Sequence, residues 1–244
     1  QDRLRLWLVD PLCCSQITFP LEMAGEGGEE EERGTLLLSH SLQVLQSRLV
    51  ERLRFQHSAT YTVSADADLS TSHPSKRYPL SGTIAISYAC RPEHIRSLSG
   101  LVLRELAALK NEGPTQKEVE TRQEISRREH ETSSKYNTWW VDRIASSYCA
   151  RINHGDVDES LKHFEHLRQS VLSELSPSVL QAVFRKHFPD LQRHTLVTLE
   201  PSLASSLTAL LARPSLVTAL LLSASLAAAG TLLLIGLRAA RRRG

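Results

Sequence analysis

The stretch LLLSHSLQVLQSRLVERLRFQHSATYTV, residues 36–63, decides the fold that we expect for this chain. Its leucines at positions 38, 42, 45, 49 and 53 recur at the period of a helix with one apolar face. That helix should end near residue 56. The segment TYTVSA, residues 60–65, is rich enough in β-branched and aromatic residues to form a strand. A long amphipathic helix therefore runs directly into a strand, and the apolar face of the helix needs a sheet to cover it.

Other strands and helices are expected on both sides of this unit. Short apolar segments at 4–9, 16–21, 82–90 and 194–199 are typical of strands, and helical spacing recurs at 95–109, 115–135, 157–175 and 176–188. Thr115 followed by Glu118 forms a capping box that opens one of these helices. The acidic run GEGGEEEER, residues 25–33, is expected to be a solvated loop. The order of elements predicts an α+β fold, a largely antiparallel sheet with helices packed on one face.

The C-terminal end differs from the rest of the chain. Residues 214–237 contain no charged residue, and about 24 helical residues span about 36 Å, more than the roughly 30 Å of a bilayer core. This predicts one transmembrane helix, with 1–201 as the folded domain, 202–213 as a linker and 238–244 as a basic cytosolic tail. The arginines that follow the apolar run would place the domain on the lumenal or extracytoplasmic side. A tail-anchored protein with a cytosolic domain is the alternative topology.

Composition excludes several classes of protein. The chain has 244 residues and a net charge of +2, but four arginines lie within its last seven residues, and the remainder is slightly acidic. Such a body lacks the basic surface of a nucleic-acid-binding protein. Four irregularly spaced cysteines, Cys13, Cys14, Cys90 and Cys149, form neither a disulfide scaffold nor a CxxC zinc site, so we expect mostly buried thiols. Because the sequence begins with Gln1, we expect a fragment or a processed piece of a longer chain.

Motifs for metal or nucleophilic catalysis are absent from the sequence. Neither HExxH nor the inverted HxxEH occurs, and no GxSxG or SxxK motif is found. The nearest approach to a zinc motif is His163-Phe164-Glu165-His166, whose histidines are three residues apart with the glutamate on another helical face. We expect these residues to lie on an exposed helix and the chain to bind no metal.

Arg54 and Tyr61 are the candidate site residues. A helix that ends near Arg54, a short turn and a strand that opens with Tyr61 can bring a guanidinium and a phenol to the same side of a cleft. Both groups donate hydrogen bonds, so together they could hold a peptide carbonyl and the oxyanion that develops from it. The spacing alone leaves open a surface arginine and a tyrosine within the sheet.

Several motifs in order resemble the C-terminal, non-zinc domain of the insulinase/pitrilysin family of zinc metallopeptidases. They are the RLxxxLR of residues 48–54, the Tyr-x-Val strand, a strand that closes on Cys-Arg-Pro-Glu (90–93), LKNEGPTQKEV (109–119) and Asn-Thr-Trp-Trp (137–140). The resemblance covers residues 1–201. It implies an insulinase or mitochondrial-processing-peptidase-like fold, and it implies that Arg54 and Tyr61, seven residues apart as in the family, contact the substrate backbone near the scissile bond.

The resemblance also implies zinc in the complete enzyme, held by an N-terminal half that carries HxxEH. This chain lacks that motif, so we expect it to be inactive by itself. The zinc-bearing half would be part of the same longer chain or a separate subunit. The sequence thus predicts the C-terminal half of a membrane-anchored zinc metalloendopeptidase that closes over a peptide or protein substrate. The alternative is a non-catalytic, peptidase-like scaffold subunit of a membrane complex.

Overall fold

A computed structural model describes residues 2–6, 13–23, 28–57, 60–69, 80–149 and 156–201. The strands are β1 (Asp2–Leu6), β2 (Cys13–Met23), β3 (Thr60–Leu69), β4 (Leu80–Cys90) and β5 (Thr195–Pro201). The helices are α1 (Glu29–His57), the short η1 (Pro92–His94), α2 (Ile95–Asn111), α3 (Gln116–Ser133), α4 (Asn137–Cys149), α5 (Val157–Glu174) and α6 (Pro177–His187).

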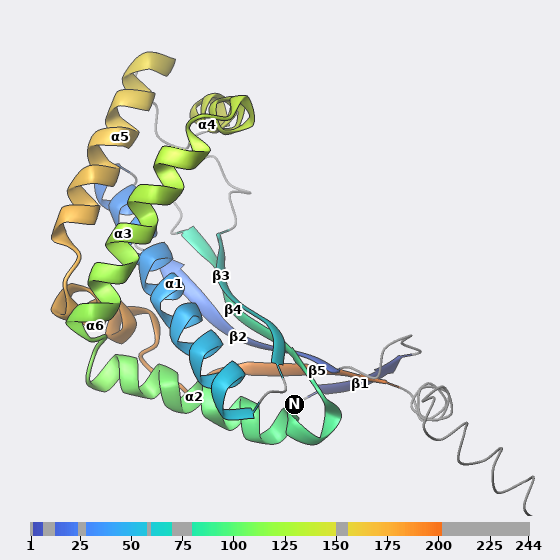
Figure 1. Ribbon diagram of the computed structural model, residues 1–244. Coiled ribbons are helices and arrows are strands. Elements are labelled where there is room, and N and C mark those ends of the chain that lie inside the picture. Colours follow the sequence, from blue (N-terminus) through green and yellow to red (C-terminus); the bar gives the residue numbers. More distant parts are fainter. Residues whose placement is uncertain are drawn as a thin grey trace, which may run out of the picture.

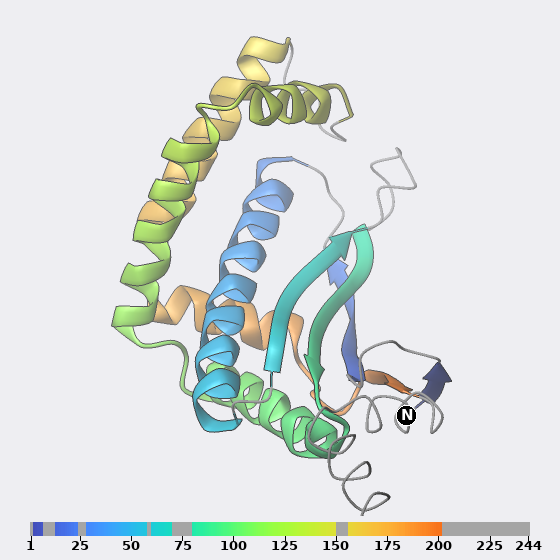
Figure 2. The ribbon, with the colours of Figure 1, turned by 45° about the vertical axis from the view of Figure 1, so that its right-hand side comes forward.

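The five strands form one sheet in the order β1-β5-β2-β4-β3. All neighbours pair antiparallel except β1 and β5, which run parallel with Asp2 opposite Val197. The helices lie on one face of this sheet, with α1 between the strands and the outer helices α3 and α5 (Figure 1, Figure 2). The expected α+β fold, a mainly antiparallel sheet covered on one face, is therefore confirmed.

The core forms between α1 and the covered face of the sheet. Burial alternates along β2, as it must when successive side chains of a strand point to opposite faces. The five leucines at the predicted helical period of α1 are each at most 2% exposed. Phe19 of β2 meets Phe188, which follows α6, edge to face with ring centroids 5.1 Å apart. These contacts hold α1, and the segment that follows α6, against the middle of the sheet.

The acidic segment 25–33 is where the local prediction fails, because α1 begins within it. Glu29, Glu30, Glu31 and Glu32 make up the first turn of the helix. Carboxylates are favourable at a helix N-terminus, where the backbone N–H groups leave a partial positive charge. The helix therefore begins about two turns earlier than the leucine pattern alone suggested, while its end at His57 lies one residue from the predicted position.

The predicted transmembrane helix is corrected. Among the residues that the structure describes, no helix is long and apolar enough to cross a membrane. The longest, α1, has 29 residues but carries charged side chains from Glu29 to Arg54 along its length. The segment 214–237 on which the prediction rested, together with 202–213 and 238–244, lies outside the described residues. The described fold is α+β without a membrane-spanning helix, and the single-pass membrane localisation predicted with it is not retained.

Candidate substrate-contact site

The candidate site lies where α1 runs into β3. Arg54 belongs to the last turn of α1, and Tyr61 is the second residue of β3, with only residues 58 and 59 between the two elements. The pairing of β3 with β4 shifts register between Thr60 and Thr62, at the position of Tyr61. Such irregularities re-aim a side chain relative to a regular strand. The side chains of Arg54 and Tyr61 themselves lie outside the described part of the chain.

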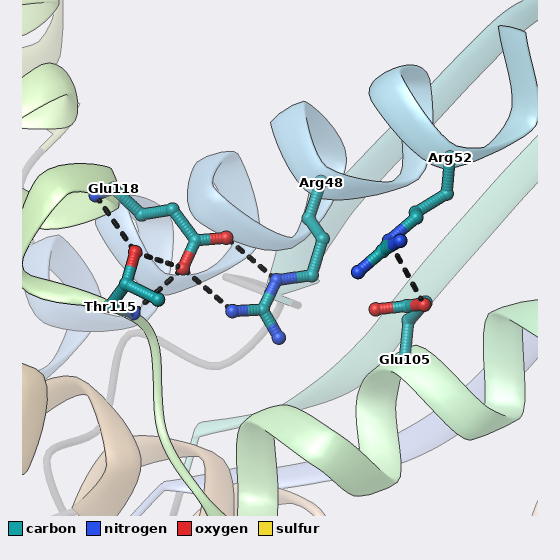
Figure 3. A network of polar contacts seen from close by, with 5 residues as sticks. All are labelled: Arg48, Arg52, Glu105, Thr115 and Glu118. Carbon is teal, nitrogen blue, oxygen red and sulfur yellow. Dashed lines mark hydrogen bonds and ion pairs between the residues drawn. The ribbon is translucent and has the colours of Figure 1, made fainter. Parts of the chain in front are cut away.

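The C-terminal half of α1 is held in place by ion pairs to the next two helices. Arg48 donates to both carboxylate oxygens of Glu118, Nε to Oε1 at 2.7 Å and Nη2 to Oε2 at 2.6 Å (Figure 3). One turn later, Arg52 lies 3.5 Å from Glu105 of α2. Arg48 is only 13% exposed, whereas Arg52 is 52% exposed. The Arg48 pair is therefore the stronger attachment, because a fork-shaped guanidinium fits a carboxylate in two places.

Glu118 also closes the capping box that the sequence predicted. The Thr115 hydroxyl oxygen accepts from the Glu118 backbone N–H, while the Thr115 backbone N–H donates to Glu118 Oε2 at 2.7 Å (Figure 3). Burial acts to raise the pKa of Glu118, but the hydrogen bonds from Arg48 and Thr115 outweigh it and leave that pKa lowered. One carboxylate thus starts α3 and fixes α1 at the same time.

A polar groove of about 580 Å³ lies between α1 and α3, beside residues 65–69 of β3. On the α1 side, Ser39, Gln43 and Ser47 recur every four residues as a second, polar stripe of the helix. Gln46 lies beside them, and its Oε1 accepts from the backbone N–H of Ala65 at 3.3 Å. Because β3 is an edge strand of the sheet, Gln46 satisfies a backbone donor that a further strand would otherwise use.

The α3 side of the groove carries a buried charge. Arg122 is 7% exposed and pairs with the more exposed Glu129 about two turns further along the helix. Its Nε and, across the groove, Oε1 of Gln43 are both buried, and neither has a hydrogen-bond partner among the residues that the structure describes. Sequence reasoning missed the groove, although the four-residue spacing of polar side chains on α1 was a visible signal.

The described residues do not fit a zinc site. Across the ranges that the structure describes, no group of three or more His, Cys, Asp and Glu side chains could hold a metal ion. In the segment His163 to His166, Nε2 of His163 lies 2.9 Å from Oε2 of Glu32, and Glu165 pairs with Arg168. His163 is thus hydrogen-bonded to Glu32, and Glu165 forms an ion pair with Arg168.

The helix α4 was not foreseen as a separate element. It leaves the end of α3 and lies apart from the sheet (Figure 2). Its exposed apolar side chains are Trp140, Val141, Ile144 and Tyr148, between 38% and 76% exposed. The motif Asn-Thr-Trp-Trp (137–140) had been noted in the sequence, without any indication that a helix begins there.

Solved structures with a similar fold include a periplasmic protease and a peptidase domain. The periplasmic protease PqqL from Escherichia coli matches with a TM-score of 0.59 and 13% identity, over 82% of this chain and 21% of that one. A peptidase M16 inactive domain from Pseudomonas fluorescens matches with a TM-score of 0.57 and 19% identity, over 82% of this chain and 43% of that one. The fold is thus that of a peptidase domain of the M16 type.

Sequence comparison adds the family. The model of the peptidase M16 inactive domain matches residues 10–125. A zinc protease PQQL-like protein from Arabidopsis thaliana is 30% identical over 203 residues, 82% of this chain and 21% of that protein. Residues 10–125 therefore match the insulinase/pitrilysin (M16) peptidase family, through an inactive domain of the C-terminal kind. The chain spans about a fifth of the length of this curated relative, a smaller share than the half that the sequence had suggested.

Proposed function

We propose that this domain binds and positions an extended peptide substrate in an M16 zinc metallopeptidase whose zinc-bearing domain is separate from it. Two facts support the proposal. The Arabidopsis relative is a zinc protease about five times as long as the matched region, which leaves room for other domains. The described residues of this chain contain no metal-binding group, so the metal would come from elsewhere.

The observation that carries the proposal is the short connection between α1 and β3. It brings the backbone positions of Arg54 and Tyr61 to the same end of the helix–strand unit, with the register shift of β3 between Thr60 and Thr62. A guanidinium and a phenol hydroxyl can both donate hydrogen bonds. They therefore suit a peptide carbonyl oxygen, which accepts hydrogen bonds, and the oxyanion formed from it.

The neighbouring structure supports the same role. A substrate contact must be held firmly to be useful in catalysis, and the Arg48–Glu118 pair anchors the turns of α1 that precede Arg54. On its α1 side, the groove beside the edge strand β3 carries several uncharged donors and acceptors, among them Ser39, Gln43 and Ser47, which suit a peptide backbone rather than a particular side chain.

Peptide binding to the full chain tests the proposal directly. We expect a fluorescein-labelled unstructured peptide to bind with saturable fluorescence anisotropy. Arg54→Ala should weaken Kd by about 10-fold or more and Tyr61→Phe by about 5-fold, the range for losing one charged and one neutral hydrogen bond. The matched controls Arg127→Ala and Tyr148→Phe change exposed residues of α3 and α4 and should leave Kd unchanged.

The same titration separates the proposal from a scaffold role. A chain that retains its circular dichroism spectrum but binds no peptide would support the non-catalytic, peptidase-like scaffold instead. Peptide binding that Arg54→Ala and Tyr61→Phe leave untouched would keep a binding function and remove these two residues from the site.

A further inference from the structure

Two buried cysteines face each other across the centre of the sheet. Cys13 begins β2 and Cys90 ends β4, and the two residues are direct partners in the antiparallel register. Both are 0% exposed and both carry free thiols. Because directly opposite residues place their side chains on the same face of a sheet, the two thiols lie side by side.

The spacing of such a pair suits a covalent bond. Opposite residues in an antiparallel pair have Cα atoms about 4.5 or 5.5 Å apart, depending on the hydrogen-bonding pattern. Disulfides span Cα distances of about 4.4–6.8 Å, so either pattern allows one with little backbone movement. Cys14 offers no such partner in the strand pairing. It lies opposite Ala89, is exposed, and points to the other face of β2.

We propose that Cys13 and Cys90 are a redox-controlled pair that forms a cross-strand disulfide. The oxidant would be a low-molecular-weight disulfide such as oxidised glutathione. One cysteine thiolate attacks the glutathione disulfide, which gives a protein–glutathione mixed disulfide and releases one glutathione thiol. The second cysteine thiolate attacks the protein sulfur of that mixed disulfide and releases the second glutathione. The protein loses two electrons and two protons, and one oxidised glutathione becomes two reduced ones.

The burial of the two thiols determines when the disulfide can form. Burial raises the pKa of Cys13 to about 11 and that of Cys90 to about 12, and each group is further raised by neighbouring negative charge. Thiolate is the attacking species, so exchange in the folded sheet is slow near neutral pH. The bond would form as β2 and β4 pair during folding, and once formed it would resist reduction in the folded domain.

The consequence for the fold is local and specific. The bond joins β2 to β4 at the end where β2 begins, and it closes a loop that contains all of α1 and β3. A crosslink over a long loop stabilises chiefly by restricting the unfolded chain. Oxidation would therefore stabilise the frame that holds the α1–β3 connection without altering its surface.

The test is disulfide mapping of the full chain refolded with oxidised and reduced glutathione. After alkylation and proteolysis, mass spectrometry should identify a peptide joining Cys13 to Cys90, with two of the four thiols no longer alkylated. Cys14→Ser, the matched control, should leave this linkage intact. The thermal midpoint should fall on adding dithiothreitol in the wild type but not in Cys90→Ala.

The disulfide mapping requires only the wild-type chain, so it tests the proposal even if a variant fails to fold. Recovery of folded protein with both Cys13 and Cys90 alkylated would overturn the proposal, as would a dominant linkage that involves Cys14 or Cys149. Fast oxidation of the already folded chain at neutral pH would contradict the proposed timing.

Discussion

Glu118→Gln is the change that best tests how α1 is anchored. Glutamine keeps the shape of the side chain and can still accept the Thr115 backbone N–H in a capping box, but it removes the charge that faces Arg48. The guanidinium of Arg48, 13% exposed, then remains largely buried without its anion. Losing a charge-assisted hydrogen bond at a partly buried site costs about 2 kcal/mol, which in a domain of this size lowers Tm by roughly 4–8 °C.

The matched control is Glu105→Gln. It removes the partner of Arg52, a single 3.5 Å contact to a side chain that is 52% exposed. An ion pair of that kind contributes less than about 1 kcal/mol, and salt screens it. Thermal unfolding followed by circular dichroism, for both variants and at two salt concentrations, measures the difference. Equal losses in the two variants would refute the reasoning that burial and two-point geometry make the Arg48 pair the main anchor.

The pH dependence gives an independent check of the same pair. The pKa of Glu118 in the folded chain is lowered from its ordinary value of 4.5. A depressed carboxyl pKa adds stability that is present above the unfolded pKa and is lost as pH falls through the folded one. The difference in unfolding free energy between wild type and Glu118→Gln should therefore be complete above about pH 5 and shrink in acid. A difference that grows in acid would contradict this assignment.

Three further predictions concern activity, pH and packing. With the zinc-bearing domain supplied, Arg54→Ala or Tyr61→Phe should lower peptide turnover by about 10²-fold, the loss typical of one oxyanion donor, and unchanged turnover in both would remove the site. Burial lowers the pKa of His187 to about 4. The stability that the neutral His187 side chain contributes is therefore complete above about pH 6.5 and is lost as the pH falls toward 4. In urea unfolding, the stability of His187→Gln should vary less with pH than that of the wild type. Gly82→Ala should destabilise by at least about 2 kcal/mol in urea unfolding, because a Cβ there would lie 1.9 Å from the Asp68 carbonyl oxygen, whereas Gly100→Ala in α2 should stabilise by about 0.5–1 kcal/mol.

The elements that could be predicted from the sequence are those with a local physical cause. The leucine period of α1 survives into the structure because the same face that shows the period is the face that is buried. Thr115 and Glu118 were identifiable because a capping box lies within four consecutive residues. Gly113, with φ of +81°, lies just after the end of α2 and before Pro114, and a glycine–proline pair is a local signal that stops a helix.

What could not be predicted depends on partners that are distant along the chain. Nothing near Asp2 indicates that β1 pairs in parallel with β5, since its partner Val197 is almost 200 residues away. The Arg48–Glu118 contact and the groove beside β3 likewise require the packing of α1 against α3. For the site, the spacing of Arg54 and Tyr61 was visible, but their proposed role came from resemblance to a family. The four glutamates at the start of α1 were misread because composition was weighed without the helix terminus that they occupy.

The strand order has a consequence for how the chain acquires this fold. β5 lies between β1 and β2, although it is the last strand to be made. A sheet begun by β2, β3 and β4 must leave one edge of β2 open while residues 91–194, which include the helices α2 to α6, are synthesised. An open edge can pair with another nascent chain, and contacts of such long sequence separation form slowly. Until the seven residues Thr195 to Pro201 have been synthesised and pair with β2, that edge therefore stays open to such contacts.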